Sequence, residues 1–595
     1  MRPDAGVEDR ATPSGPAPAS SRGGGLVLPA VIAAAIATAF WPSLWSSFVW
    51  DDEAFFIQNP HYRGLGWSQL RWMFSSDLLG HYSPLSWLTH GLEYLVWGLN
   101  PFGYHLTNLA LHVVNALLFL GIARRLLGRA TTLTGPALGA GAGVAALFFA
   151  LHPLRVESVA WISERRGVLS ATLFLVTVGL YLQAADSHGR PRRRFLVASL
   201  LAYALGGIAK SMVMSLPAVL VLLDLYPLRR LPANPRRWLA PAVRPLWREK
   251  LPYLAIGVAA GAIAYTARSA NIRMLAPDAW LAKVVYTLWL PVQKTLIPVG
   301  LSPLYELPLR LDPREPRFLV AALGILGVTA LALALARAWP AGLAVWVYQG
   351  LVLAPVASFT HAGVQLTADR YTYLATLGSA LLVGAGGGMV VRAGRAAGAV
   401  RRQAHLGLAL LAAWLIGLGV LTWHQTRIWR DTGTLWSHAL TITPDCAICL
   451  NNLGTWHLNR GDARSALPRL SALAAVRPTT PMVFGRLGHA YYQLGHLPEA
   501  IAAYRAELAR LPEAVPLRLW LANALLQSHR PAEAVAQYRQ VIDAWPREPN
   551  ARAGLAQAHL LLGESGQARE QYDVLRTLDP ELAARLRGAF EPEGR

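Results

Sequence analysis

The segment "GLVLPAVIAAAIATAFWPSLWSSFVWDDEAFFIQNP", residues 25–60, decides the fold class of this chain. Its first part, residues 25–49, carries no charge and is long enough to cross a bilayer as a helix of about 20 apolar residues. It lacks a convincing small-x-small cleavage site, so we predict a retained transmembrane helix rather than a signal peptide. The acids Asp51, Asp52 and Glu53 follow at once. Carboxylates at a membrane edge are costly unless they have a function there.

The composition extends this membrane assignment to most of the chain. Of the 595 residues, 54% are hydrophobic and 15% are charged, whereas soluble domains average about 25% charged residues. The net charge of +21 is uneven: the first 430 residues hold 38 basic and 18 acidic side chains, and the rest hold 17 and 16. The excess lies in short loops between apolar runs, as the positive-inside rule requires. We therefore expect a membrane and no nucleic acid as a partner.

The apolar runs predict about eleven membrane spans. After the first, they lie at about 102–124, 134–151, 158–184, 194–209, 211–227, 251–268, 317–337, 341–359, 372–392 and 405–424. The loops after every second span are basic and are placed in the cytoplasm. This alternation predicts a multi-pass inner (plasma) membrane protein whose N-terminus is cytoplasmic and whose C-terminal part is periplasmic or extracellular.

Three regions follow from this pattern. Residues 1–24 are rich in Pro, Gly, Ala and Ser and are predicted to be a disordered cytoplasmic tail. Residues 25–430 form the transmembrane domain. Its external loops at 50–101 and 269–316 contain amphipathic stretches that carry too many polar residues to span the membrane. We expect these stretches to form helices that lie along the membrane surface or re-enter it.

From residue 431 to 595 the sequence becomes soluble and repeats every 34 residues. Leucine, alanine and proline recur in register at Leu453, Leu487, Leu521 and Leu555, at Ala466, Ala500, Ala534 and Ala568, and at Pro478, Pro512, Pro546 and Pro580. A 34-residue helix-turn-helix period with small residues at packing positions is that of the tetratricopeptide repeat. The fold class is therefore all-α, a polytopic helix bundle followed by a solenoid of four repeats.

A second polar cluster lies in the external turn "LHPLRVESVAWISERRG", residues 151–167. A helix that begins near the proline of this turn places four side chains on one stripe: Glu157, Trp161, Glu164 and Arg165. Such a stripe must face a polar cavity or form a structural ion-pair cluster between helices. Other polar residues on the same predicted side could surround that cavity: His81, His152, Arg155, Lys210, Asp369, Arg370 and Tyr371.

Carboxylates beside Arg and Lys at a membrane surface suit sugar transfer from a lipid phosphate. A carboxylate can take the proton from an attacking hydroxyl group, and the cations can stabilise a departing phosphate. A lipid-phosphate sugar would bring its tail through the bilayer and its reactive carbon to this depth. A transporter is less natural, because coupling acids usually lie near the membrane midplane.

Several motifs and their order resemble one known family. They are "FVWDDEAFFIQNP", "HYSPLSWLTHGLEYLVWGLNPFGYHLTNLALHVVNALLF", "LHPLRVESVAWISERRGVLSATLFL", "ADRYTYLATLGSAL" and "WRDTGTLWSHALTITPD", followed by repeats. Together they resemble the transmembrane and tetratricopeptide-repeat-containing proteins. That family includes protein O-mannosyltransferases and bacterial relatives of the GT-C glycosyltransferase type.

The resemblance implies a sugar transferred from a polyprenyl-phosphate donor to a Ser or Thr hydroxyl of an acceptor polypeptide. It makes Asp51 or Asp52 the acid that acts as base or orients the acceptor, and Glu157 the second catalytic acid. It also makes phosphate-binding candidates of three cations, Arg155, Arg165 and Lys210. A divalent metal, Mg²⁺ or Mn²⁺, is a further possibility if Asp51, Asp52 and Glu53 act together as ligands.

Two points stay open at this level. Cys446 and Cys449 form a lone CxxC that is either a local disulfide or a pair of exposed thiols. The repeats are equally compatible with a non-catalytic, membrane-anchored scaffold for envelope assembly, and a lipid-linked-sugar transporter is a third hypothesis. The acids at the loop entrances favour the enzyme.

Overall fold

The structure is a computed structural model that describes residues 26–268, 272–357, 360–362 and 364–590. The predicted tail, residues 1–24, lies outside the described residues. All eleven apolar segments expected from the sequence are helical: α1 (Val27–Phe40), α4 (Pro101–Ala130), α5 (Gly135–Leu151), α7 (Arg165–Ala185), α8 (Gly189–Ala209), α9 (Leu216–Leu225), α10 (Arg244–Arg268), α12 (Pro316–Ala334), α13 (Pro340–Leu353), α15 (Leu377–Ala393) and α16 (Gly398–Ile428).

Only some of these helices are long and apolar enough to span a membrane. Six helical segments of the described chain are long and apolar enough to cross a bilayer, and the number rises to eight if each of two bent helix pairs is one span. The bent pairs join α5 to residues 153–160 and residues 369–375 to α15, and Ser211–Leu225 and Pro340–Leu353 are shorter apolar helices. The class, a helical membrane bundle, is confirmed, whereas the number eleven and the sidedness remain predictions.

Close helix packing in the bundle depends on glycine. A Cβ atom added to Gly141 on α5 would lie 2.8 Å from the carbonyl oxygen of Gly384 on α15, and one added to Gly384 would lie 2.5 Å from that of Gly141. Small residues let membrane helices approach until their backbones touch. The two glycines therefore hold α5 against α15, the helix that follows the Asp369–Tyr371 segment.

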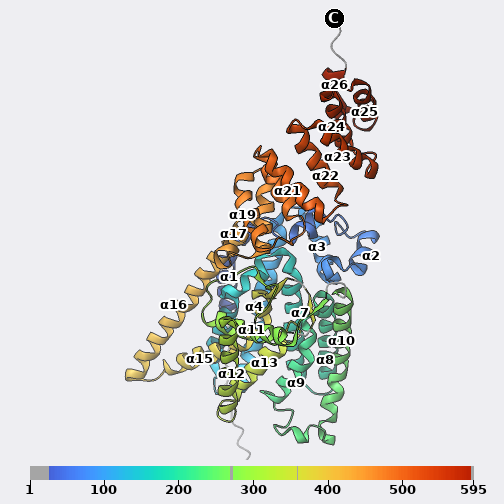
Figure 1. Cartoon of the computed structure of the whole chain (residues 1–595). Helices are drawn as coiled ribbons and strands as arrows, with labels where there is room; N and C mark the ends of the chain where they lie inside the picture. The colour runs from blue at the N-terminus through green and yellow to red at the C-terminus, as the bar shows by residue number, and fades with distance from the viewer. Residues whose placement is uncertain (1–25, 269–271, 358–359, 363, 591–595) are drawn as a thin grey trace, which may run out of the picture.

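Both loops that the sequence predicts to be external contain helices. The first loop folds into η2 (Glu53–Ile57), α2 (Trp67–Ser75) and α3 (Pro84–Trp97), and the later loop contains α11 (Pro277–Leu296). Two small antiparallel pairs join β1 (Ile272–Met274) to β3 (Thr360–Ala362) and β2 (Tyr305–Glu306) to β4 (Gln365–Thr367). Helices α2 and α3 lie at the end of the bundle from which the C-terminal helices emerge (Figure 1).

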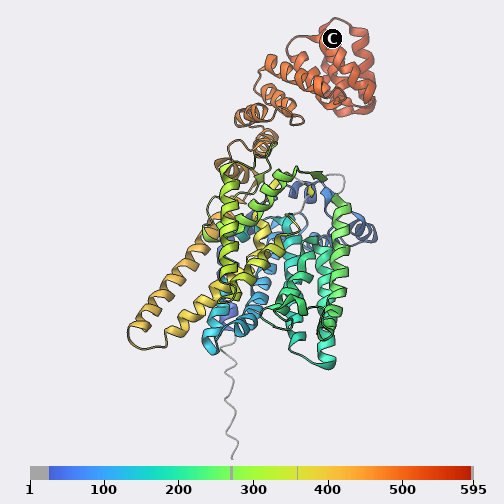
Figure 2. The same ribbon diagram turned by 60° about the horizontal axis from the view of Figure 1, so that its bottom comes forward.

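The C-terminal part is a chain of helix pairs that runs away from the bundle (Figures 1 and 2). It consists of α17 (Thr432–Ile442), α18 (Ala447–Asn459), α19 (Ala463–Val476), α20 (Val483–Gln493), α21 (Leu497–Arg510), α22 (Val515–Gln527), α23 (Pro531–Ala544), α24 (Pro549–Leu561), α25 (Ser565–Leu578) and α26 (Pro580–Phe590). The repeated alanines Ala466, Ala500, Ala534 and Ala568 are all fully buried, so the 34-residue period marks the contact between paired helices.

One expectation about the turn at residues 151–167 is wrong. Residues 153–185 do not form one helix: η4 (Pro153–Arg155), α6 (Val156–Ala160) and η5 (Ile162–Glu164) precede α7. The chain breaks at Trp161, whose backbone is extended (φ −86°, ψ 117°). Helical spacing therefore does not align Glu157 with Glu164 and Arg165, and their positions depend on what packs against the turn.

Candidate active site

Three segments converge beneath the emerging repeats: the first loop at Asp51–Asp52, the turn from His152 to Arg166, and η10 (Asp369–Tyr371). Hydrogen bonds and ion pairs between these segments bring their polar side chains together. Sequence reasoning selected all three, and the structure places them at one end of the bundle.

Glu157 and Arg370 form the centre of this cluster. The backbone N–H of Arg370 donates to Glu157 Oε2 at 2.6 Å, and its guanidinium group forms an ion pair with the same carboxylate. Both side chains are less than 10% exposed. The Arg370 guanidinium also lies over the ring of Trp161, 5.4 Å from its centre. Arg370 therefore fastens η10 to the turn.

Two further cations, Lys210 and Arg166, lie next to the Glu164 carboxylate. Lys210, between α8 and η6 (Ser211–Ser215), donates to Glu164 Oε1, and Arg166 lies 3.8 Å from the other carboxylate oxygen. A small cavity beside this pair is lined by His81, Arg166 and Lys210. The cavity thus brings a residue of the first loop to two cations, one on α7 and one in the break between α8 and η6. The charge of these two cations matches that of a phosphate, and the cavity itself, at about 30 Å³, has room for about one water-sized group.

Asp51 and Asp52 have different surroundings. Asp52 is fully buried and accepts hydrogen bonds from the N–H of Val49 (3.0 Å), from the N–H of Ser163 (2.9 Å) and from the Ser163 hydroxyl. Burial raises the pKa of Asp52 to about 7, although these three donors lower it. Asp52 therefore ties the first loop to the turn.

The Asp51 carboxylate is half-buried and accepts no hydrogen bond from any residue of the described chain. Burial raises its pKa, and the positive charges of Arg166 and Arg370 oppose that rise. Asp51 thus remains accessible beside the cationic cluster, with an unoccupied acceptor oxygen. Of the two neighbouring aspartates, Asp52 uses its carboxylate in hydrogen bonds within the protein and Asp51 does not.

The three adjacent acids do not form a metal site. Asp52 turns toward Ser163, while Glu53 is exposed and accepts from Gln58 Nε2 at 3.3 Å. Across the described residues, no group of three or more His, Cys, Asp or Glu side chains is placed to hold a metal ion. The side chains do not fit the Mg²⁺ or Mn²⁺ considered from the sequence, so we derive no step that needs one.

Three other candidate residues hold backbone segments in place. Arg165 is buried in an ion pair with Glu93 of α3 (2.7 Å) and donates to the carbonyl oxygen of Tyr104 (2.7 Å). Arg155 donates to Phe149 O (3.1 Å) and to the Thr372 and Thr376 hydroxyl groups. His152 Nε2 lies 3.2 Å from Thr295 O of α11.

The last two candidates flank Arg370. Asp369 is buried and accepts a hydrogen bond from the Tyr305 hydroxyl group (2.8 Å), and the Tyr371 hydroxyl accepts from Gln365 Nε2 (3.0 Å). Sequence reasoning missed Tyr305 and Glu93. Glu93 carried a usable signal, because it is the one acid in the apolar α3 segment, whereas Tyr305 carried none.

Tryptophans connect this cluster to the first C-terminal helix. Trp50 stacks on Trp161 with ring centres 4.6 Å apart, and it contacts Trp436 of α17 edge-on at 5.1 Å. Trp429, at the end of α16, lies 6.0 Å from Trp161. The base of the solenoid thus packs directly against the residue that precedes Asp51.

A second contact between the two parts is ionic. Glu306 of β2 accepts from the N–H of Ala447, the first residue of α18, at 2.8 Å and pairs with Arg477 at 2.7 Å. A carboxylate at a helix N-terminus is favourable because it satisfies an orphan N–H group and complements the helix dipole. Cys446 and Cys449 form a disulfide at the same helix end, which resolves the alternatives left by the sequence.

We expect Glu306→Gln to loosen this junction without unfolding either part. Loss of the ion pair and weakening of the N–H contact should lower amide-exchange protection in α18 and α19 on the order of tenfold, since a hydrogen bond to a charged group contributes about 1.5–3 kcal/mol. Hydrogen exchange followed by mass spectrometry measures this. Glu513→Gln, an exposed change in the same solenoid, is the matched control. Equal protection in the two variants would contradict the role of Glu306.

The fold and the site define a helical membrane protein with a C-terminal solenoid, and comparison identifies the repeats. A family model described as tetratricopeptide repeat matches residues 451–515 and 519–583, so this part of the chain consists of tetratricopeptide repeats. Among solved structures, MamA from Desulfovibrio magneticus RS-1 is 16% identical (TM-score 0.24) over 25% of this chain and 84% of that one. YrrB, a TPR protein with an unusual peptide-binding site, is 14% identical (TM-score 0.25) over 31% and 90%.

Two curated proteins are similar in sequence. Protein O-mannosyl-transferase TMTC1 of Homo sapiens is 30% identical over 183 residues, 28% of this chain and 20% of that protein. The Mus musculus protein of the same name is 31% identical over 168 residues, 26% and 17%. The match spans about a fifth of the length of these relatives. The expected resemblance to the transmembrane and tetratricopeptide-repeat-containing proteins is confirmed as this partial similarity.

Proposed function

We propose that this chain is an integral-membrane glycosyltransferase that moves a sugar from a polyprenyl-phosphate donor to a Ser or Thr hydroxyl group of a polypeptide on the outer face of the membrane. The observation that carries the proposal is the unbonded, half-buried Asp51 carboxylate beside Arg166 and Arg370. The partial similarity to an O-mannosyl-transferase supports the reaction class.

In the proposed reaction, Asp51 takes the proton of the acceptor hydroxyl as its oxygen attacks the anomeric carbon of the sugar. A bond forms between that oxygen and carbon, and the bond from the carbon to the phosphate oxygen breaks. The electron pair leaves with the polyprenyl phosphate. Cations stabilise this developing charge most strongly where water is excluded, and we assign this role to Lys210 and Arg166, which line the small cavity next to Glu164.

The remaining polar residues position this machinery. Asp52 holds the first loop on the turn through Ser163, and Glu157 holds η10 through Arg370. The Trp50–Trp161–Trp436 contact sets the repeats above the site, where their concave face would present the acceptor polypeptide.

Transfer by the purified full-length protein tests the proposal. We expect detergent-solubilised full-length protein to add one hexose to Ser/Thr-containing peptides when a polyprenyl-phosphate sugar is supplied, as measured by the intact mass of the peptide.

 Peptides in which alanine replaces every Ser and Thr are the control and should stay unmodified. A protein that binds the donor and modifies no hydroxyl group would contradict the proposal.

A further inference from the structure

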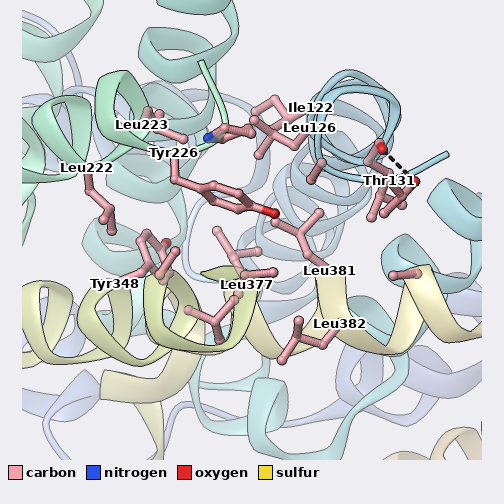
Figure 3. A pocket seen from close by; sticks show the side chains of 18 of the residues that line it. Ile122, Leu126, Thr131, Leu222, Leu223, Tyr226, Tyr348, Leu377, Leu381 and Leu382 are labelled. Atoms are coloured by element: carbon pink, nitrogen blue, oxygen red, sulfur yellow. Dashed lines mark hydrogen bonds between the residues drawn. The ribbon is translucent and has the colours of Figure 1, made fainter. Parts of the chain in front are cut away.

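A large apolar cavity lies between five helices of the bundle, α4, α7, α9, α13 and α15, and its volume is about 450 Å³. Figure 3 shows leucine and isoleucine side chains projecting into it, with the ring of Tyr226 across one side. Its lining is mostly aliphatic and includes Ile122, Leu126, Leu222, Leu377, Leu381 and Leu382. An apolar space of this size matches hydrocarbon rather than a sugar or a peptide.

The cavity extends from Leu377, at the start of α15, toward the end of the bundle away from the candidate active site. Helix α4 begins next to α3 and runs for 30 residues, a length of about 45 Å. The cavity is lined by the last residues of α4 and by Thr131 and Thr132 beyond it. It is therefore separate from the site that holds Asp51.

The rim of the cavity is cationic. Arg229 lines it directly, and Arg392 Nη1 donates to the hydroxyl group of the lining residue Thr132 at 2.7 Å. No Asp or Glu is among the described residues that line it. Tyr226 and Trp339 also lie there, and Tyr and Trp are enriched where a membrane meets water.

We propose that this cavity binds one acyl chain of an anionic phospholipid, with the lipid phosphate at the rim that carries Arg229 and Arg392. The positive charge of the rim favours an anionic headgroup, and the apolar wall favours the acyl chain of the lipid. At about 30 Å³ for each water-sized group, the space accepts on the order of fifteen such groups, most of one acyl chain. The lipid comes from the leaflet that faces the basic loops.

Bound lipid would also support the helices that carry the active site. The hydroxyl group of Tyr348, a lining residue, donates to the carbonyl oxygen of Leu374 at 2.9 Å. Leu374 lies in α14 (Thr372–Ala375), directly after η10. A filled cavity therefore backs the segment from which Arg370 reaches Glu157.

The test is lipid retention by the full-length protein in mild detergent, measured by native mass spectrometry after incubation with phosphatidylglycerol or phosphatidylcholine. We expect the wild-type protein to keep one phosphatidylglycerol, and at least tenfold less phosphatidylcholine. Leu381→Trp, which fills the cavity, should lower phosphatidylglycerol retention at least tenfold. Leu410→Trp, an equal change at an exposed position of α16, is the matched control and should retain the lipid.

A second variant keeps the proposal testable if the tryptophan disturbs folding. Arg229→Gln combined with Arg392→Gln changes exposed side chains and should abolish the preference for phosphatidylglycerol. Equal retention of the two lipids by the wild-type protein, or unchanged preference in the double variant, would overturn the proposal. Displacement of phosphatidylglycerol by a polyprenyl phosphate would also overturn it and would assign the cavity to the donor tail.

Discussion

Asp51→Asn is expected to lower sugar transfer by about 10²–10⁴-fold, the contribution of a general base, while the protein stays folded. The asparagine side chain cannot take the proton of the acceptor hydroxyl group. Because the Asp51 carboxylate accepts no hydrogen bond from the described residues, its replacement should leave thermal unfolding unchanged. Transfer to a Ser/Thr peptide and unfolding followed by tryptophan fluorescence are measured on the same preparations.

The pH dependence of sugar transfer shows whether Asp51 acts as a general base or only supports the structure. Asp51 must be ionised to take a proton, so transfer falls as the pH drops through the pKa of this group. Burial raises that pKa above the 3.8 of an exposed aspartate, which moves the acid limb of the wild-type profile to higher pH. The residual transfer of the Asp51→Asn variant should lack this limb.

Neighbouring acids supply the controls. Glu53→Gln changes an exposed residue and should leave transfer within about twofold of the wild type, as surface changes usually have small effects. Asp52→Asn weakens the attachment of the first loop to Ser163, so we expect it to abolish transfer through loss of position. Normal transfer by both the Asp51→Asn and the Asp52→Asn variants would contradict the assignment and favour a scaffold.

Arg370→Met is expected to have the largest effect on stability. It leaves the buried Glu157 carboxylate without its ionic partner and removes a cation 4.0 Å from Glu164. Breaking a buried pair by removing one partner costs about 3–5 kcal/mol. We expect the unfolding free energy in detergent to fall by about that amount, together with a loss of transfer.

A double variant tests whether the pair itself is responsible. In Glu157→Gln combined with Arg370→Met, no buried charge is left unpaired at this contact, so much of the lost stability should return. Transfer should not return, because η10 loses its attachment to the turn. A double variant as unstable as the sum of the two single variants would contradict direct coupling between Glu157 and Arg370.

The parts of the fold that the sequence predicts are those encoded by residues close together in the chain. Apolar runs, loop amphipathicity and the 34-residue period are properties of neighbouring residues, and each one appears in the structure as a helix or helix pair. The break at Trp161 was not predicted, because the sequence around it has no proline or glycine that would stop a helix there. Contacts of the Trp161 ring with Trp50 and with the Arg370 guanidinium accompany the break.

The sequence predicted which residues belong to the candidate site, but it did not predict which of them contact one another. Asp51, Asp52, Glu157 and Arg370 stood out because charges are rare in apolar sequence. Their roles did not follow from that. Arg165 turns away to Glu93, and Glu306 reaches Arg477 across the junction with the repeats.

The sequence by itself therefore determined an all-α membrane bundle, a repeat solenoid and the segments that carry acids and cations. Only the tertiary structure decided which carboxylate is bonded, which is accessible and which cation each one meets. The physical reason is distance along the chain: Glu157 and Arg370 are 213 residues apart, and Asp52 and Ser163 are 111 apart. Helical periodicity acts over a few residues, whereas the partner of a buried charge is chosen when distant segments pack together.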